Sequence, residues 1–428
     1  IAESPLRKGM SGVGTDDGNL QLSTDDGASW DNLSKKLPGV KEGFWIPQIV
    51  ASTHSEGEVF VVVNDYRRND WTPYLFHSRD YGKSWRQIAD SKQVDGYCLA
   101  IAQDPEVEDL LFLGTDRGLY ISLDHGTNWT KWTEGYPSVP TRDLKVHPRE
   151  GDLIIGTFGR SVWIMDDLTP LRTLAKEGMA MMDSAMHLFP IKDSYSWEWK
   201  PASSGRFFGQ GEFAGRNLWT AARIPVWLKE PQENEKFAIV VFDQQGDTIR
   251  NYSYPADTGY SILTYSFARN GPARPSRREP RADYVPRGRQ ILPGTYTIQV
   301  KYGEDSARQE FRYNFDPRLN YTPAQVAARE AMAVQYEDIV QQSTERMKEA
   351  EKILTRVENY IALAPDSIQD TLKTIHSQLR DSISDMMDVY FEPEGVVGYD
   401  HVTERLGTYS WKAMDLISNG FGMPGQNA

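Results

Sequence analysis

Three copies of an eight-residue pattern constrain this chain more than any other feature of its sequence. The pattern is Ser-x-Asp-x-Gly-x-x-Trp, and its copies run from Ser23 to Trp30, from Ser78 to Trp85 and from Ser122 to Trp129. Their aspartates, Asp25, Asp80 and Asp124, are 55 and 44 residues apart. Repeats of about 40 to 50 residues are typical of β-propeller blades. We therefore expect a repeat fold with one small sheet for each copy.

The segments around these boxes repeat as well. Gly-Thr-Asp-x-Gly lies before two boxes, at residues 14–18 and 114–118, and a degenerate copy occupies residues 156–160. Each unit is predicted to contain a strand, a loop, a strand, a tight glycine turn, a strand, the box turn and a last strand. Residues 1–170 then hold about four units, of which the fourth lacks a good box.

The residue types of the box suit a tight turn. Its aspartate can accept backbone N–H groups, and its glycine (Gly27, Gly82 or Gly126) supplies a positive φ. Its tryptophan begins the last strand, where we expect the ring to be buried between neighbouring sheets. We therefore interpret Asp25, Asp80 and Asp124 as structural residues and not as catalytic ones.

These boxes resemble the Asp-box (BNR) repeats of sialidases, sortilin-like propellers and related bacterial proteins that carry the label glycosyl hydrolase. The resemblance covers residues 1–170, and more weakly extends to about residue 318. It implies a propeller whose boxes lie at the blade periphery, away from the central binding face. It also implies an exported protein that is secreted, periplasmic or on the cell surface.

The number of units leads to a further expectation about partners. Closure of a propeller by four blades is uncommon, and Ile1 lies inside the expected first strand of a unit. We expect that the chain is the carboxy-terminal part of a larger propeller protein. The remaining blades would precede it or come from another envelope subunit.

The rest of the chain predicts a second β domain and a helical tail. Residues 171–222 are interpreted as a linker and packing segment. About seven short strands within residues 223–318 favour a β-sandwich of the immunoglobulin or fibronectin-III type. Residues 319–428 predict a helical hairpin or tail, with helices over 324–364 and 367–390 and a further segment over 409–417. The fold class is mainly β with an α-helical tail.

A cluster of arginines within residues 269–289 stands out in a chain whose net charge is −13. Its members are Arg269, Arg274, Arg277, Arg278, Arg281, Arg287 and Arg289. Guanidinium groups bind carboxylate and sulfate, so this loop could contact an acidic protein or an anionic polysaccharide. The favoured alternative is a solvated hairpin loop without a ligand.

Composition excludes several classes of function. The acidic net charge argues against nucleic acid as the main partner, and no apolar run is long enough to span a bilayer. Cys98 is the only cysteine, so the chain has no disulfide framework. None of the seven histidines lies in a His-Glu-x-x-His motif, and we therefore expect no metal and no cofactor. His125, inside a box, has an ordinary loop placement.

No catalytic constellation can be assembled from the sequence. A glycosidase needs two carboxylates about 5 to 10 Å apart, and spacing does not select them among 60 acidic residues. Asp65, Asp70, Asp116 and Asp166 lie near turns and could face either rim of a propeller, and Arg160 lacks two partners for a sialidase-like triad. We expect a binding or scaffold module for peptide, protein or glycan. A glycoside hydrolase, with its site completed by other blades, is the alternative.

Overall fold

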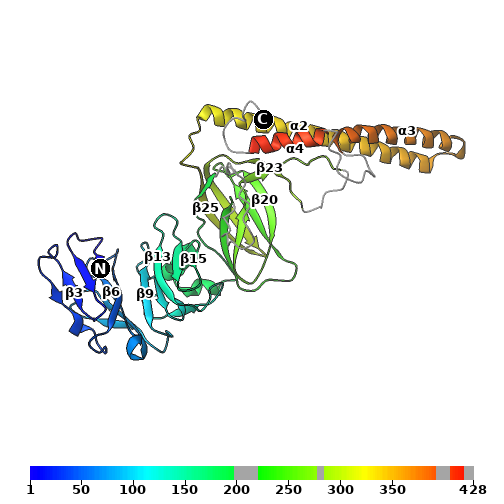
Figure 1. Cartoon of the computed structure of the whole chain (residues 1–428). Coiled ribbons are helices and arrows are strands. Elements are labelled where there is room, and N and C mark those ends of the chain that lie inside the picture. The colour runs from blue at the N-terminus through cyan, green and yellow to red at the C-terminus, as the bar shows by residue number, and fades with distance from the viewer. Residues whose placement is uncertain (197–219, 277–283, 392–404, 419–428) are drawn as a thin grey trace. The chain divides into compact units, whose positions relative to one another are not determined.

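The computed structural model describes residues 1–196, 220–276, 284–391 and 405–418, and these form two compact units, Ile1–Phe189 and Pro190–Ala428 (Figure 1). The protein is mainly β. Several small antiparallel sheets that resemble propeller blades come first, and long helices follow toward the carboxy terminus (Figure 1). This confirms the predicted class of a β protein with a helical tail.

The first unit contains four successive antiparallel sheets, each formed by neighbouring segments of the chain. The first has β1 (Ala2–Glu3), β2 (Ser11–Gly14), β3 (Leu20–Ser23) and β4 (Asp31–Asn32). The second has β5 (Trp45–Ala51), β6 (Val59–Asp65), β7 (Asp70–Ser78) and β8 (Arg86–Ala89), with η1 (Ser34–Lys36) before it and η2 (Tyr66–Arg68) inside it. In both sheets the strands follow chain order, as expected for blades.

The third sheet repeats this plan, and the fourth has one strand fewer. The third has β9 (Cys98–Gln103), β10 (Leu111–Thr115), β11 (Gly118–Ser122) and β12 (Thr130–Trp132). The fourth has β13 (Thr141–Val146), β14 (Leu153–Thr157) and β15 (Val162–Met165). After it come α1 (Thr169–Glu177), η3 (Met179–Asp183) and β16 (Met186–Leu188). Arg172 of α1 is bound to Asp104, with Nε 2.9 Å from Oδ2, which fixes α1 beside the third sheet.

The hydrophobic core lies between successive sheets. One cluster joins residues of the first and second sheets, among them Leu20 and Phe76. A second joins the second and third sheets through Phe60 and Leu111. A third joins the third and fourth sheets and includes Phe112. The second and third sheets therefore bury both faces against their neighbours, which is how stacked repeats form a continuous core.

The second unit begins with a β domain. A five-stranded sheet has the order β17 (Ser194–Ser196), β25 (Asp305–Phe315), β24 (Gly294–Tyr302), β19 (Lys236–Phe242) and β20 (Thr248–Pro255). The remaining strands pair as β18 (Ala222–Leu228) with β21 (Gly259–Tyr265), and β22 (Ala268–Asn270) with β23 (Arg287–Gln290). Phe267 stacks on Tyr313 of β25 with ring centroids 4.2 Å apart, and Phe311 also contacts Tyr265. These buried aromatic rings pack the segment between β21 and β22 against the larger sheet.

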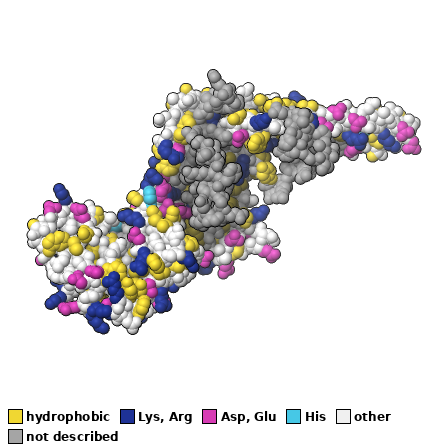
Figure 2. All heavy atoms as spheres, viewed as in Figure 1, with side chains coloured by type: hydrophobic (Ala, Val, Ile, Leu, Met, Phe, Trp, Pro, Cys, Tyr) yellow, Lys and Arg dark blue, Asp and Glu magenta, His cyan; other side chains and the backbone are white. Residues whose placement is uncertain are grey.

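Three helices follow, namely α2 (Pro323–Leu363), α3 (Asp366–Tyr390) and α4 (Leu406–Ser418). The long α2 starts where it does because Thr322 and Gln325 form a capping box and Pro323 occupies the first turn. Helices α2 and α3 run side by side (Figure 1). Figure 2 shows acidic and basic side chains interspersed along the far part of this pair, as on a solvated helical surface. No helix in the described parts of the chain is apolar enough over a sufficient length to cross a membrane.

The structure directs part of the arginine cluster inward. Arg289 of β23 donates from its side chain to Glu330 and Glu337 of α2, and its backbone N–H donates to Glu337 Oε1. Arg269 is half-buried on β22, Arg274 contacts Met414 of α4, and Arg287 is exposed. Arg277, Arg278 and Arg281 lie outside the described residues. The described arginines therefore do not all lie in one solvated loop, because Arg289 is bound to α2 and holds this helix to the β domain.

This contact predicts a loss of stability on substitution. Arg289→Met is expected to lower the free energy of unfolding by about 2 to 3 kcal/mol, because two largely buried carboxylates lose their partner. Arg287→Met, two residues away on the exposed side, is expected to change it by less than about 0.5 kcal/mol. Urea denaturation of the full chain followed by circular dichroism at a helical wavelength measures both values. Equal effects of the two substitutions would contradict a docking role for Arg289.

Candidate functional site

The three boxes form nearly identical turns. In the first, the Ser23 hydroxyl donates to Asp25 Oδ1 at 2.8 Å and accepts the Gly27 N–H at 2.9 Å. Asp25 Oδ1 also accepts the N–H of Ser29 at 2.8 Å. The same bonds recur around Asp80 and Asp124, at distances between 2.8 and 2.9 Å. Each carboxylate is therefore engaged inside its own turn.

These bonds favour the ionised form of the carboxylates. Side-chain and backbone hydrogen bonds from Ser84 lower the pKa of Asp80 to about 2. Bonds from Ser29 lower the pKa of Asp25. Burial acts in the opposite direction on Asp124, but the bonds from Asn128 and Ser122 still give a lowered pKa. A carboxylate of this kind does not serve as a general acid near neutral pH.

The box tryptophans differ in burial, contrary to the expectation that all three are buried. Trp129 is 7 % exposed and donates from Nε1 to Ile88 O of the preceding sheet at 2.6 Å. Trp30 is 43 % exposed, and its Nε1 bonds to Gly27 O within its own turn. The reason is positional: each box packs against the sheet before it, and within the described residues the first sheet has none before it.

The two ends of the sheets carry different groups. Because the strands are antiparallel, the box turns lie at one end, together with the turns that join the first and second strands of each sheet. The turns between second and third strands lie at the opposite end. So do the connections from each sheet to the next. Chemistry-bearing side chains gather at both ends.

An aromatic cluster occupies the end opposite the boxes. It contains Trp45, Tyr66, Trp71 and Tyr97, and we call it the aromatic face. Tyr66 stacks on Tyr97 with centroids 4.7 Å apart, and Trp71 lies 5.6 Å from Tyr97. Arg67 lies over the ring of Trp45 at 4.6 Å. Trp71 is 51 % exposed, and its ring is tilted by 44° to Tyr66 and by 55° to Tyr97, so the face presents an angled apolar surface to solvent.

Three carboxylates border the aromatic face, and their environments differ. Asp65 is paired with Arg68 at 2.7 Å. Asp70 accepts from Tyr74 Oη and Thr72 N, and hydrogen bonds to these residues outweigh burial and lower its pKa. For Asp116, burial raises the pKa, and the nearby Asp95 acts in the same direction. Asp116 is thus shifted toward the protonated form, whereas Asp70 is shifted away from it.

Gly96 fixes the position of Asp116. It has φ +82°, and a Cβ at this position would lie only 1.9 Å from Asp116 Oδ1. The chain therefore passes close to the carboxylate, which accepts the N–H of Tyr97 at 3.0 Å. A side chain at residue 96 would displace Asp116 and Tyr97 together.

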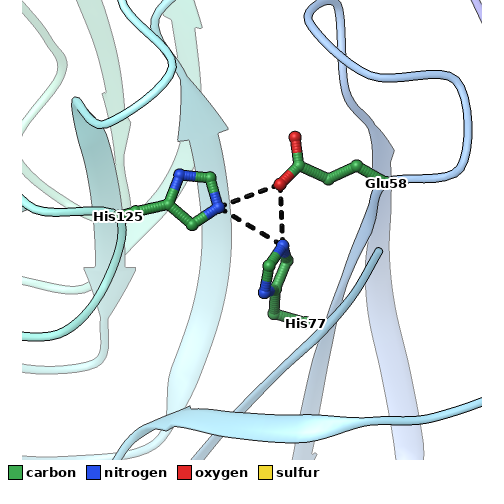
Figure 3. A group of neighbouring side chains, drawn as sticks. All are labelled: Glu58, His77 and His125. Atoms are coloured by element: carbon green, nitrogen blue, oxygen red, sulfur yellow. Dashed lines mark hydrogen bonds and ion pairs between the residues drawn. The ribbon is translucent and has the colours of Figure 1, made fainter. Parts of the chain in front are cut away.

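A second group lies at the box end, between the second and third sheets. Glu58 ends the turn between β5 and β6, His77 is near the end of β7, and His125 is in the third box (Figure 3). Glu58 Oε1 is 2.7 Å from His77 Nε2 and 2.9 Å from His125 Nε2, and the two Nε2 atoms are 3.3 Å apart. All three side chains are buried. We call this group the Glu–His–His cluster.

The cluster is held by further contacts. Burial alone would raise the pKa of Glu58, but hydrogen bonds with His125, His77 and Ser52 outweigh it and lower the pKa. Arg79 Nε lies 3.4 Å from Glu58 Oε1, and its Nη2 is paired with Glu108 at 2.8 Å. The ring of His77 stacks on Phe60 with centroids 4.8 Å apart. The cluster is therefore anionic at Glu58 and rigidly packed.

No motif in the sequence brings these three residues together. The expectations that His125 is an ordinary loop residue and that the chain holds no metal rested on the absence of two histidines at helical spacing, whereas Glu58, His77 and His125 come from strand ends and turns. The sequence signal that could have linked the two histidines is the box itself, since His77 directly precedes the second box and His125 lies inside the third. Arg160, in the turn between β14 and β15, is exposed and bonds to the carbonyl of Gly159. Asp166 directly follows β15, near the box end.

Comparisons with known proteins found only distant matches. No family model and no curated protein matches the chain. Among solved structures, it is similar to an ancestral GH74 enzyme (14 % identity, TM-score 0.31), covering 59 % of this chain and 32 % of the other. It is also similar to a GH74 enzyme from Niastella koreensis, with 14 % identity and a TM-score of 0.32 over 72 % of this chain and 53 % of the other. A GH74 xyloglucanase from Xanthomonas campestris matches with 12 % identity and a TM-score of 0.32 over 71 % of this chain and 44 % of the other. The chain spans between a third and about half of the length of these proteins.

Proposed function

We propose that this chain is an exported Asp-box propeller module that binds a neutral glycan on its aromatic face. The observation that carries the proposal is the cluster of Trp45, Tyr66, Trp71 and Tyr97, with half of Trp71 exposed at the end opposite the boxes. Flat aromatic rings give a large apolar contact area at low entropic cost, and the surrounding carboxylates accept hydrogen bonds from hydroxyl groups.

Electrostatics favours a neutral ligand over an anionic one. Asp65, Asp70 and Asp116 border the face, but Arg67 lies over Trp45 and Arg68 is paired with Asp65, so the local charge is mixed. The chain as a whole has a net charge of −13, and this acidic field disfavours an anionic polysaccharide more than a neutral sugar. A peptide or protein ligand is the other outcome that the test below distinguishes.

We propose that the four sheets are propeller blades, that the β domain of the second unit is an immunoglobulin-like sandwich, and that the helices contact other proteins. Export to the periplasm, the cell surface or the medium follows from the likeness of the boxes to those of exported proteins. A further set of blades, or another envelope subunit, is the proposed partner.

The binding proposal is tested with a panel of soluble neutral oligosaccharides, measured by titration calorimetry. We expect at least one to bind, and Trp71→Ala to weaken binding about tenfold or more, since a stacked ring contributes about 1 to 2 kcal/mol. Trp30→Ala is the matched control, because Trp30 is also exposed but lies at the box end. Equal weakening by both substitutions, or binding only of peptides, would contradict the proposal.

One observation favours the second candidate, a glycoside hydrolase. A general acid must be protonated, and the raised pKa of Asp116 moves this carboxyl in that direction. If the chain hydrolyses a glycan, reducing ends should appear with the wild-type chain and fall at least about a hundredfold with Asp116→Asn. If it only binds, neither chain should release reducing ends and the substitution should leave binding within about threefold.

A further inference from the structure

The Glu–His–His cluster joins side chains from two different sheets. Glu58 and His77 belong to the second sheet and His125 to the third, and their Oε1, Nε2 and Nε2 atoms point toward one another (Figure 3). Nothing in the proposed glycan site uses them, because the aromatic face lies at the opposite end of the sheets. The cluster therefore needs its own explanation.

The hydrogen bonds of His125 direct a lone pair into the cluster. Its Nδ1 is 3.1 Å from the carbonyl oxygen of Glu108, and a carbonyl only accepts, so Nδ1 carries the hydrogen. In the neutral ring Nε2 then has no hydrogen, and it faces the Glu58 carboxylate at 2.9 Å. Arg79 Nη2 lies 3.2 Å from His125 Nε2, and Arg79 Nε lies 3.4 Å from Glu58 Oε1, so in the metal-free chain the arginine is the cation that faces both acceptors.

We propose that Glu58, His77 and His125 bind a divalent transition metal, with Zn²⁺ as the preferred ion. Two imidazoles and one carboxylate form a familiar zinc ligand set. The second sphere is also suitable, because His125 Nδ1 donates to a backbone carbonyl and Gln103 Nε2 lies 3.4 Å from Glu58 Oε2. Such contacts orient the ligands before the metal arrives.

The distances between the three ligand atoms fit an ion of this size. A point equidistant from all three lies about 1.7 Å from each, whereas zinc requires about 2.0 to 2.1 Å. An ion displaced by about 1.1 Å from the plane of the three atoms meets that requirement. Tetrahedral zinc places its ligand atoms about 3.3 Å apart, so the two shorter edges must widen by about half an ångström.

A fourth coordination position can reach solvent. A depression borders the cluster and is lined by His77, Ser78, Arg79, Ser84, Trp85, Arg86 and His125. Water entering from this side would complete a tetrahedral site. Arg79 also lies here, and its charge opposes a cation. Its side chain is 58 % exposed and already paired with the exposed Glu108, so it can move toward solvent with that partner.

Zinc at this position would clamp the second sheet to the third. Titration of the metal-free full chain is expected to show one Zn²⁺ per chain with a Kd of about 1 µM or tighter. A hundredfold excess over Kd should raise the Tm of the first unit by about 5 to 10 °C. Failure of the wild-type chain to bind zinc at 100 times this concentration would overturn the proposal.

Two pairs of variants locate the site. His125→Asn removes a ligand while keeping a residue that tolerates the φ of 57° at this position, and it should weaken zinc binding about a hundredfold or more. His147→Asn changes a half-buried histidine outside the cluster and should leave binding unchanged. Equal losses in both, or full binding by His125→Asn, would place the zinc elsewhere.

The second pair of variants predicts tighter zinc binding, which is a change that misfolding does not produce. Arg79→Gln removes the competing cation and should tighten zinc binding about threefold to tenfold. Arg86→Gln removes an exposed arginine that lines the same depression and should change the affinity less than twofold. Weaker binding by Arg79→Gln would contradict the placement of the ion beside Glu58.

Discussion

Replacing Trp129 by alanine is expected to lower the free energy of unfolding of the first unit by about 3 to 5 kcal/mol. The indole is 7 % exposed, belongs to the core between the second and third sheets, and donates to the carbonyl of Ile88 at 2.6 Å. Alanine would leave a cavity between the two sheets and an unsatisfied carbonyl.

The first box supplies a matched control for the Trp129 prediction. Trp30 occupies the same position in the first box but is 43 % exposed, so Trp30→Ala should cost less than about 1 kcal/mol. Chemical denaturation of the full chain, monitored by hydrogen exchange of peptides from the first unit, measures the free energy of unfolding of both variants. A similar cost for the two substitutions would show that the box turn, and not packing between sheets, determines the contribution of the tryptophan.

The second large effect is expected at Glu58. Glu58→Ala should lower the free energy of unfolding by about 3 to 5 kcal/mol in the absence of metal, because it leaves two buried histidines facing each other without their carboxylate. Glu56→Ala is the control, since the contacts of Glu56 with Arg7 at 3.2 Å and with Tyr81 Oη at 3.1 Å are both exposed and should contribute less than about 1 kcal/mol. Denaturation in the presence of a chelator measures both.

The same residue predicts a dependence on pH. The pKa of Glu58 is lowered in the folded chain relative to its ordinary value of 4.5. Its contribution is therefore complete above that value and is lost as the pH falls through the acid range toward the lowered pKa. The stability difference between the wild-type chain and Glu58→Ala should shrink over this range. A difference that stays constant down to about pH 2 would contradict the lowered pKa.

The regular elements could largely be predicted from the sequence. Among the strands expected within residues 223–318, β24 (Gly294–Tyr302) begins at the glycine of Pro293-Gly294, which is a local signal. The helix predicted over 324–364 is observed as Pro323–Leu363, because the capping box at Thr322 and the break at Pro365 are local signals. The turns of the boxes were also visible, since Asp, Gly and Trp repeat at fixed positions.

The site residues could not be predicted in the same way. Glu58 lies in a turn without a recognisable pattern, and its contact with His125 depends on how one sheet packs against the next. The aromatic face likewise joins Tyr66, in the short helix η2, to Tyr97, which precedes β9. The inward direction of Arg289 required knowledge of where α2 begins relative to β23. The first two are contacts between repeats, and the third joins a strand to a helix far along the chain, so periodicity within one repeat carries no information about any of them.

The most direct test of the central claim is hydrogen–deuterium exchange of the wild-type chain with and without the panel of neutral oligosaccharides. The account predicts slower amide exchange in residues 65–72, 95–98 and 116, which form the aromatic face and its border, and unchanged exchange in the three boxes. Slower exchange confined to the boxes, or no change anywhere in the first unit with any member of the panel, would contradict it.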